Sequence, residues 1–381
     1  MGEKMGCRKM KSNNFKKVIL VGGVMGLVAV NTLAGNIPKI NLNDNKILML
    51  QSPFIENGRT YVPLRAVSEN LGAVVKWEAE TKTITINNGK TTVICQIGNN
   101  QATVNSKQVP LEALPKHKFG STCVPLRFTS DCLGAEVNYD KNSNTIDITY
   151  EVPEKAGVKY VDGRAIRTTA LPKNAKDFPY ILEGIPNEMY ELKAEYEYLS
   201  TAKEGKDYIR PCNVKTDPFY SEENVKLWKK IVESNLDHKF NVDYTTIDNN
   251  WAVEMAKTYI EAQSEEKVHY NKYLNYAKDY ISYVKRNKIK IEGDYYVEPS
   301  ICYLESGAMY LRCWVSFKCT SSATGNFKLF EKHESVLKAG TTYAGYVDIG
   351  LGTSTYGADG KDLGIGRDTI SETAGIKEMK K

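Results

Sequence analysis

Carboxylate side chains are the residues of this sequence that could support catalysis with the fewest additional groups. Glycoside hydrolysis needs two carboxyl groups a few ångströms apart, one acting as the acid and the other as base or nucleophile. Candidates for such a pair are frequent in the second half of the chain: Glu183, Glu188, Glu191, Asp294, Glu298 and Glu305. A hydrolase that modifies the cell wall or a polysaccharide, with its active site in this half, is therefore one hypothesis.

Histidine residues are too sparse and too scattered to form a recognisable catalytic or metal motif. The chain has four of them: His117, His238, His269 and His333. It contains no His-Glu-x-x-His, Gly-x-Ser-x-Gly or P-loop pattern. A nucleophilic pair of Cys212 or Cys313 with His238 or His333 stays open, because such partners need only meet in the fold. We therefore predict no catalytic residue, no metal ligand, no cofactor-binding residue and no cofactor.

The cysteines do not have the pattern of a disulfide framework. Cys7 precedes an apolar run near the N-terminus, and seven cysteines follow it: Cys95, Cys123, Cys132, Cys212, Cys302, Cys313 and Cys319. An odd number cannot all pair, and no Cys-x-x-Cys spacing suggests zinc. We expect most of these side chains to be small buried hydrophobes.

A tandem repeat organises the first half of the chain. The stretch from Arg59 to Ile86 is followed by a second copy that ends at Ile148, at an offset of 62 residues (124 − 62, from Val62 and Val124). Between residues 61–86 and 123–148, 12 of the 26 aligned pairs are identical. Such self-similarity indicates two structural units of the same kind.

Each copy predicts a strand, a short helix and a β-hairpin. A proline favours the start of the helix, leucines at helical spacing form its buried face, and a glycine suits a left-handed helix end. The motif comprises Pro63, Leu64, Arg65, Leu71, Gly72 and Trp77, then Pro125, Leu126, Arg127, Leu133, Gly134 and Tyr139. The two arginines precede an acidic residue by four positions, so we interpret them as local ion-pair partners. Contact with a ligand is the alternative.

These residues give the chain a family resemblance. The stretches NGRTYVPLRAVSENLGAVVKW and VPLRFTSDCLGAEVNYD closely resemble the copper amine oxidase N-terminal domain-like, or stalk-domain, family over residues 40–150. The resemblance implies a twisted antiparallel sheet packed on a short helix. It also implies a non-catalytic module of exported proteins of Gram-positive bacteria, placed beside a variable partner domain.

Amine oxidase activity is not expected from this resemblance. Asn138-Tyr139-Asp140 matches the Asn-Tyr-acidic pattern around the oxidase's quinone-forming tyrosine, but it falls in the hairpin of the second copy. The oxidase also needs three copper-binding histidines, two of them as His-x-His, and the four histidines of this chain are far apart. An aromatic core role explains Tyr139 better.

The N-terminal residues predict a secretory signal peptide over residues 1–34. A basic segment is followed by the apolar run Val18–Val30, and Thr32-Leu33-Ala34 supplies small residues for cleavage before Gly35. The run is too short for a comfortable membrane span. We therefore expect a secreted or cell-surface protein with no stable membrane span after cleavage, and an uncleaved anchor is the alternative.

The second half of the chain has a different character. Residues 151–157 have linker composition, and of 24 tyrosines 21 lie beyond Tyr150. We expect a stalk domain over 35–150, with copies at about 40–87 and 100–149, and a Tyr-rich domain over 158–381. The latter should have a hairpin at 158–170, a proline-rich segment at 171–191, helices at 221–232 and 249–286, and antiparallel strands beyond 295. The predicted fold class is α+β.

Together these features favour an exported, non-catalytic protein of the cell envelope. The stalk copies would act as a spacer or attachment module for a C-terminal binding domain, and the wall- or polysaccharide-modifying hydrolase is the alternative. The partner would be a cell-wall polymer or an envelope or extracellular protein. The net charge of +5 is too diffuse to suggest nucleic acid.

Overall fold

The computed structural model describes most of the chain from residue 38 onward. The described residues are 38–118, 121–151, 158–161, 164–192, 209–211, 218–259, 268–305, 308–331, 335–352, 360–361, 363–368, 370 and 375–379. Residues 36–381 form one compact unit. The predicted signal peptide over 1–34 lies outside the described residues.

The N-terminal region (residues 39–149) contains the two predicted strand–helix–hairpin units. The first consists of β4 (Arg59–Pro63), α1 (Leu64–Asn70), β5 (Val74–Glu78) and β6 (Thr83–Asn87). The second consists of β11 (Ser121–Pro125), α2 (Leu126–Leu133), β12 (Glu136–Asp140) and β13 (Thr145–Thr149). Strands β4 and β11 pair antiparallel with Val62 opposite Val124, so equivalent positions of the two units face each other.

The helices begin and end where the sequence predicts. Pro63 and Pro125 are the residues just before α1 and α2. Gly72 and Gly134 follow these helices with φ of +73° and +86°, the left-handed conformation that glycine adopts without steric cost. Four motif leucines are buried in the core of this region: Leu64, Leu71, Leu126 and Leu133.

Three sheets contain the strands of the N-terminal region. They are β5-β6-β7-β8-β9, β12-β13-β1-β2 and β10-β11-β4-β3. The additional strands are β1 (Lys39–Leu42), β2 (Asn45–Lys46), β3 (Phe54–Glu56), β7 (Thr92–Gln96), β8 (Gln101–Val104), β9 (Lys107–Pro110) and β10 (Lys116–Lys118). The sheets are antiparallel except that β1 runs parallel to β13, with Ile40 opposite Ile146. No hairpin joins these two strands, so no tight turn imposes an antiparallel direction.

One sheet dominates the C-terminal region (residues 158–379). Its long strands β18 (Lys290–Glu305), β19 (Ala308–Ser321) and β22 (Thr342–Gly352) form an antiparallel core. Four short strands pair with this core: β16 (Ile209–Pro211), β17 (Asn241–Asp243), β23 (Gly364–Arg367) and β24 (Ile376–Glu378). The fold is α+β, as predicted from the sequence.

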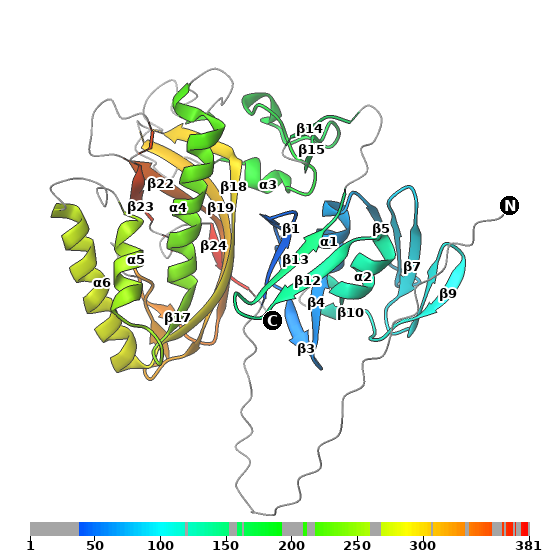
Figure 1. The fold of residues 1–381 in the computed structure, drawn as a ribbon, viewed down its shortest axis with the longest axis horizontal. Helices are drawn as coiled ribbons and strands as arrows, with labels where there is room; N and C mark the ends of the chain where they lie inside the picture. The colour runs from blue at the N-terminus through cyan, green and yellow to red at the C-terminus, as the bar shows by residue number, and fades with distance from the viewer. Residues whose placement is uncertain are drawn as a thin grey trace, which may run out of the picture. The chain divides into compact units, whose positions relative to one another are not determined.

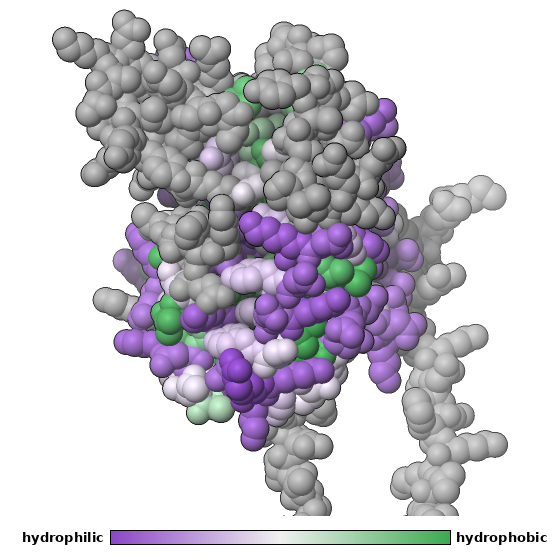
Figure 2. Space-filling model, turned by 90° about the vertical axis from the view of Figure 1, so that its left-hand side faces the viewer, coloured by the Kyte–Doolittle hydropathy of each residue, from purple (hydrophilic) through white to green (hydrophobic). Residues whose placement is uncertain are grey.

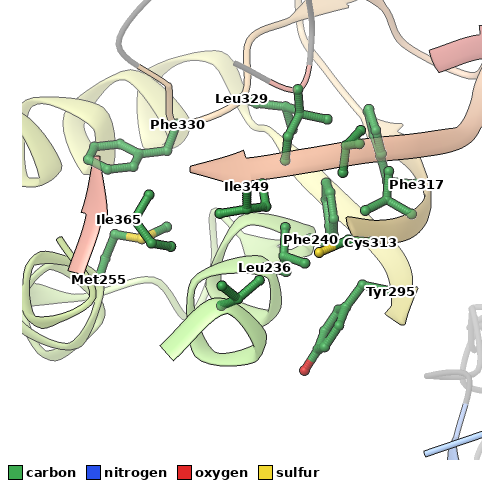
Figure 3. Packing of buried hydrophobic residues seen from close by; sticks show 14 of the residues in the cluster. Leu236, Phe240, Met255, Tyr295, Cys313, Phe317, Leu329, Phe330, Ile349 and Ile365 are labelled. Carbon is green, nitrogen blue, oxygen red and sulfur yellow. The ribbon is translucent and has the colours of Figure 1, made fainter. Parts of the chain in front are cut away.

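Three helices cover one face of this sheet (Figure 1). They are α4 (Glu222–Phe240), α5 (Asn249–Lys257) and α6 (Val268–Asn287). The predicted cap of α4 is present, because the backbone N–H of Asn224 donates to Ser221 Oγ at 3.3 Å. Figure 3 shows Leu236 and Phe240 of α4 packed against Cys313 and Phe317 of the sheet.

The opposite face is covered by residues 158–161 and 164–192, hereafter the covering segment. It contains the strand pair β14 (Tyr160–Val161) and β15 (Arg164–Ala165), a 3₁₀ turn over Ala175–Asp177 and the short helix α3 (Asn187–Tyr190). Its buried residues include Leu182, Met189 and Tyr190, which pack with Tyr296 and Trp314 of the sheet. The proline-rich stretch 171–191 is thus a meandering segment packed on the core.

The prediction of one helix over 249–286 was wrong, because α5 and α6 are separate helices. Helix α5 ends at Lys257, and the chain then turns toward β23. The N–H of Ile365 donates to the carbonyl of Thr258 at 2.8 Å, and Tyr259 forms a bridge with Ile365. Thr258 and Tyr259 leave the helical conformation because their backbone pairs with β23, although the helical periodicity of the sequence continues.

Short strands occur in three further places. Residues 116–118 form β10, in which exposed His117 pairs with Thr122. Strand β20 (Asn326–Phe327) pairs with β21 (Leu337–Lys338), and residues 328–331 are irregular. Strands β23 and β24 both pair with β22.

Helix α6 carries a stripe of tyrosine and apolar residues at helical spacing, and this stripe packs in the core. Ala277, Tyr280 and Val284 are buried, and Tyr273 packs partly buried against the same core. Among the coloured residues of the face shown in Figure 2, hydrophobic ones appear as small separate patches between hydrophilic ones. This stripe is therefore not an exposed binding platform.

Replacing Gly293 by alanine tests the packing of α4 on the sheet. A Cβ there would lie 2.7 Å from Ser316 O and 2.9 Å from Phe240 Cβ. Because overpacking costs about 1–3 kcal/mol, G293A should lower the free energy of unfolding by that amount in urea denaturation. The neighbouring E292A, which removes only a partly exposed ion pair with Lys290, should cost less than about 1 kcal/mol. Equal losses would contradict the prediction.

Candidate functional site

A pocket with a volume of about 790 Å³ is the candidate site. Four parts of the chain line it: residues 42–47 and 69–75 of the N-terminal region, the covering segment, the first turns of α4, and Tyr296 and Pro299 of β18. A volume of this size is within the range of small-ligand pockets. Its lining contains apolar, aromatic and charged side chains, so it has the mixed chemistry of a binding site.

Arg164 of β15 is the positively charged residue that the covering segment contributes to the pocket lining. Its Nη1 atom lies 2.8 Å from Glu298 Oε2, and the Glu298 side chain is fully buried. The same oxygen accepts from Tyr296 OH at 2.7 Å, while Ser300 N–H donates to the other carboxylate oxygen at 3.0 Å. Burial alone would raise the pKa of Glu298, but Arg164 and these donors hold it below its ordinary value.

Two carboxylates approach each other in the same pocket. Glu69 lies in the last turn of α1, and Glu183 follows the covering segment's buried Leu182. Burial raises the pKa of Glu69, Arg65 lowers it and Glu183 raises it, with a net increase. The two segments are in contact here, since a Cβ on Gly184 would lie 3.6 Å from Asn70 Nδ2.

Backbone hydrogen bonds fix Glu183 relative to Arg164. The Glu183 N–H donates to the carbonyl of Ala165 at 2.9 Å, and Arg167 N–H donates to Ile181 O at 2.7 Å. The chain therefore doubles back as a short antiparallel pair, with Ile166 opposite Leu182. This arrangement places the pocket's arginine and its exposed carboxylate on adjacent strands of one segment.

Two lysines from α4 complete the charged lining. Lys226 Nζ lies 3.8 Å from Glu222 Oε2, and Lys229 Nζ lies 3.6 Å from Glu233 Oε1, both pairs at i,i+4 spacing. Pairs of this kind on a helix surface contribute only about 0.3–0.5 kcal/mol each. Their ammonium groups are thus available to a ligand at small cost.

The carboxylates singled out from the sequence do not all meet in this site. Glu183 and Glu298 lie in the same neighbourhood, but Glu298 is fully buried and paired with Arg164. Asp294 pairs with Lys46 at 2.5 Å, and both Glu188 and Glu191 are exposed. Glu305 is the last residue of β18. The one carboxylate facing Glu183 in the pocket is Glu69, which sequence reasoning treated only as an ion-pair partner.

The cysteines are free and mostly buried, as predicted for the described ones. Cys95, Cys123, Cys302, Cys313 and Cys319 are buried, and Cys132 is intermediate. Burial raises the pKa of the Cys95, Cys123 and Cys132 thiols to about 11, so these thiols are poor nucleophiles. Cys212 lies outside the described residues.

The described histidines belong to local structure. His238 Nδ1 lies 2.7 Å from the carbonyl of Ser234 within α4, and His269 belongs to α6. His333 lies outside the described residues. Within the described part of the chain, no group of three or more His, Cys, Asp or Glu side chains is placed to hold a metal ion.

The motif arginines and aromatics lie at the surface of the N-terminal region. Arg65 Nε is 3.5 Å from Glu69 Oε1, the local ion pair proposed from the spacing. Burial raises the pKa of Asp131, and the nearby Arg127 offsets part of this increase. Trp77 and Tyr139, at equivalent positions of the two units, are 43% and 52% exposed. The aromatic core role expected for Tyr139 was therefore wrong, because its hairpin holds the ring at the surface.

Sequence reasoning missed the residues that shape the pocket. Arg164, Tyr160 and Tyr180 carry no motif, and their spacing in the sequence does not indicate a shared site. The only available signal was the density of aromatic and proline residues at 171–191. The pocket arises because this segment packs both on the sheet and beside α1.

Comparison with known proteins identifies the N-terminal region alone. Residues 41–148 match the family model of the copper amine oxidase N-terminal domain, which confirms the resemblance seen in the sequence. The chain is also 31% identical over 125 residues to a protein of Brevibacillus choshinensis named protease inhibitor. This alignment covers 32% of the chain and 38% of that relative, so the chain spans well under half of the relative's length. No solved structure matches the chain.

The ion pair of Arg164 and Glu298 should contribute strongly to stability. Removing one partner of a buried pair leaves an uncompensated charge and costs about 3–5 kcal/mol, so R164M should lower the free energy of unfolding by that amount at pH 7. The control K226M removes only an exposed pair and should cost less than about 0.5 kcal/mol. Similar losses for both variants in chemical denaturation would show that the Glu298 charge is not buried.

The same pair predicts loss of stability in acid. Because the folded-state pKa of Glu298 lies below the ordinary value of 4.5, its contribution is fully present above about pH 4.5. It is lost as the pH falls through the folded-state pKa. The difference in unfolding free energy between the wild type and E298Q should therefore shrink below pH 4.5, and a constant difference down to pH 2 would argue against this assignment.

Proposed function

We propose that this chain is an exported, non-catalytic protein of the cell envelope. The N-terminal region serves as an attachment or spacer module, and the pocket-bearing remainder binds an envelope or extracellular partner. The partner class is a cell-wall polymer or a protein of the envelope. The domain boundaries at residues 35, 151 and 158 remain part of this proposal.

One observation carries the proposal: outside the pocket carboxylates Glu69 and Glu183, several described groups with catalytic potential are engaged in internal structure. Glu298 is paired with Arg164, the described cysteines are largely buried, and the fully buried Lys239 pairs with Asp368. Asp368 also accepts from the hydroxyl of Tyr259. These interactions hold the C-terminal segment on α4 and α5, and they leave the mixed lining of the pocket for recognition.

The comparisons support the same proposal. The N-terminal match is to a non-catalytic module of the oxidase family, as the sequence resemblance implies. The relative from Brevibacillus choshinensis is named as an inhibitor, a function that requires binding and no catalysis. Inhibition of a protease is therefore one form that recognition of an extracellular protein could take.

A wall- or polysaccharide-modifying hydrolase is the second candidate function. It is favoured by the meeting of Glu69 and Glu183 in one pocket, because a carboxyl with a raised pKa beside an exposed carboxylate is the arrangement that glycoside hydrolysis uses. Release of soluble sugar from purified cell walls, lost in both E69Q and E183Q, would establish this function and overturn the non-catalytic one.

Export is tested by following the chain in a Gram-positive host. The wild type should appear in the wall or medium fraction with Gly35 as its N-terminal residue. The variant L27K/V28D, which places charges in the apolar run, should remain inside the cell, whereas the control K11Q should be exported. Cytoplasmic retention of the wild type would contradict the proposal.

Attachment is tested by sedimentation of the full chain with purified cell walls across a salt series. Exposed aromatics bind sugars and other flat surfaces, so W77A/Y139A should reduce the pelleted fraction several-fold if the N-terminal region is the attachment module. V336A removes a 62% exposed apolar side chain from the C-terminal region and should pellet like the wild type. Absence of pelleting by the wild type would contradict attachment.

A further inference from the structure

Among the described residues, most charged side chains that line the pocket have a partner of opposite charge, but Glu183 does not. Lys46, Arg164, Lys226 and Lys229 each have an acidic partner, and Glu69 is paired with Arg65. Glu222 is engaged by Lys226. Within the described part of the chain, Glu183 forms no ion pair, although it lies in the pocket beside Glu69. The lining therefore retains negative charge on the side where α1 meets the covering segment.

The backbone that carries the Glu183 and Glu69 side chains is held in place by hydrogen bonds. Glu183 is fixed through its own N–H to Ala165 O, and Gly184 follows it with φ of +74°. Glu69 projects from α1 beside Asn70, whose amide nitrogen donates to Ala66 O at 2.7 Å. Two carboxylates anchored on separate elements form a preorganised receptor for a protonated amine, since charge-assisted hydrogen bonds are the stronger class.

Aromatic side chains supply the second part of the recognition surface. Tyr160, Tyr180 and Tyr296 line the pocket, and Tyr296 is held by its hydrogen bond to Glu298. Aromatic faces attract cations and pack on the apolar stem of a long amine. The volume of about 790 Å³ exceeds that of a single ammonium ion and fits a short peptide.

The two lysines of α4 provide charge of the opposite sign in the same pocket. Lys229 is 22% exposed and Lys226 is 64% exposed, and the salt links that hold them are 3.6 and 3.8 Å long. A ligand carboxylate can compete with such weak pairs. The pocket thus offers carboxylates on one lining segment and ammonium groups on another.

We propose that this pocket binds a short peptide that carries both a free amine and a free carboxylate. The amine pairs with Glu183 and Glu69, the tyrosines contact the apolar part, and the peptide carboxylate pairs with Lys226 and Lys229. This inference rests on the proposed binding function, which it deepens by naming the ligand class. A peptide segment of an envelope polymer has this chemistry.

Isothermal titration of the full chain with the tripeptide Lys-Ala-Ala tests the amine contact. The free peptide should bind, and its form acetylated on both amines should bind at least about tenfold more weakly, because acetylation removes the cation and keeps the backbone. E183Q should lose about tenfold in affinity for the free peptide and discriminate poorly between the two forms. E188Q, which changes an exposed carboxylate of α3 outside the pocket, should behave like the wild type.

The carboxylate contact is tested separately with the peptide amidated at its C-terminus. The wild type should prefer the free acid, and K226M/K229M should bind both forms equally. If E183Q does not fold, as judged by its circular dichroism melt, E69Q replaces it with the same expected loss. Equal binding of the free and acetylated peptides, or no binding by the wild type, would overturn the proposal.

Failure of this inference can be distinguished from failure of the proposed function. Wild-type chain that pellets with cell walls but does not bind the tripeptide refutes the ligand class and leaves the envelope function standing. Chain that binds the tripeptide but is retained in the cytoplasm supports the pocket's ligand and refutes the envelope function.

Discussion

Burial of both faces of the long strands is the constraint on which the C-terminal region depends. Successive side chains of β18 point to opposite faces. Tyr295 and Val297 enter the core under the helices, whereas Tyr296 and Glu298 enter the layer formed by the covering segment. A strand buried on both sides has no position for an uncompensated charge, so Glu298 requires Arg164.

The pocket is a consequence of this two-sided burial. The covering segment must supply apolar side chains to one face of the sheet, and its prolines prevent it from doing so as a regular helix. It doubles back between Ile166 and Leu182 instead. The doubled segment leaves Arg164 at the sheet and Glu183 beside α1, with the tyrosines between them in the lining. Arg164 therefore has two roles in the structure, since it neutralises Glu298 and also lines the pocket.

Local signals predicted elements well wherever a few neighbouring residues decide the conformation. The helix start at Ser221, the glycine ends of α1 and α2 and the strands predicted beyond residue 295 are such cases. Predictions failed where distant backbone competes. Thr258 and Tyr259 leave the helical pattern because β23, more than a hundred residues away, pairs with them. The candidate site shows the same limit, because Glu69 and Glu183 come from elements that no periodicity connects.

The sequence by itself determined the two strand–helix–hairpin units, their family and the α+β class, since these follow from turn residues, helix ends and hydrophobic period within short windows. It also excluded a recognisable histidine motif. Tertiary structure alone decided which carboxylates meet, that Glu298 is neutralised, and that the tyrosines of α6 are a core face. The reason is physical: burial and charge pairing depend on which surfaces pack together, and that packing is a property of the whole chain.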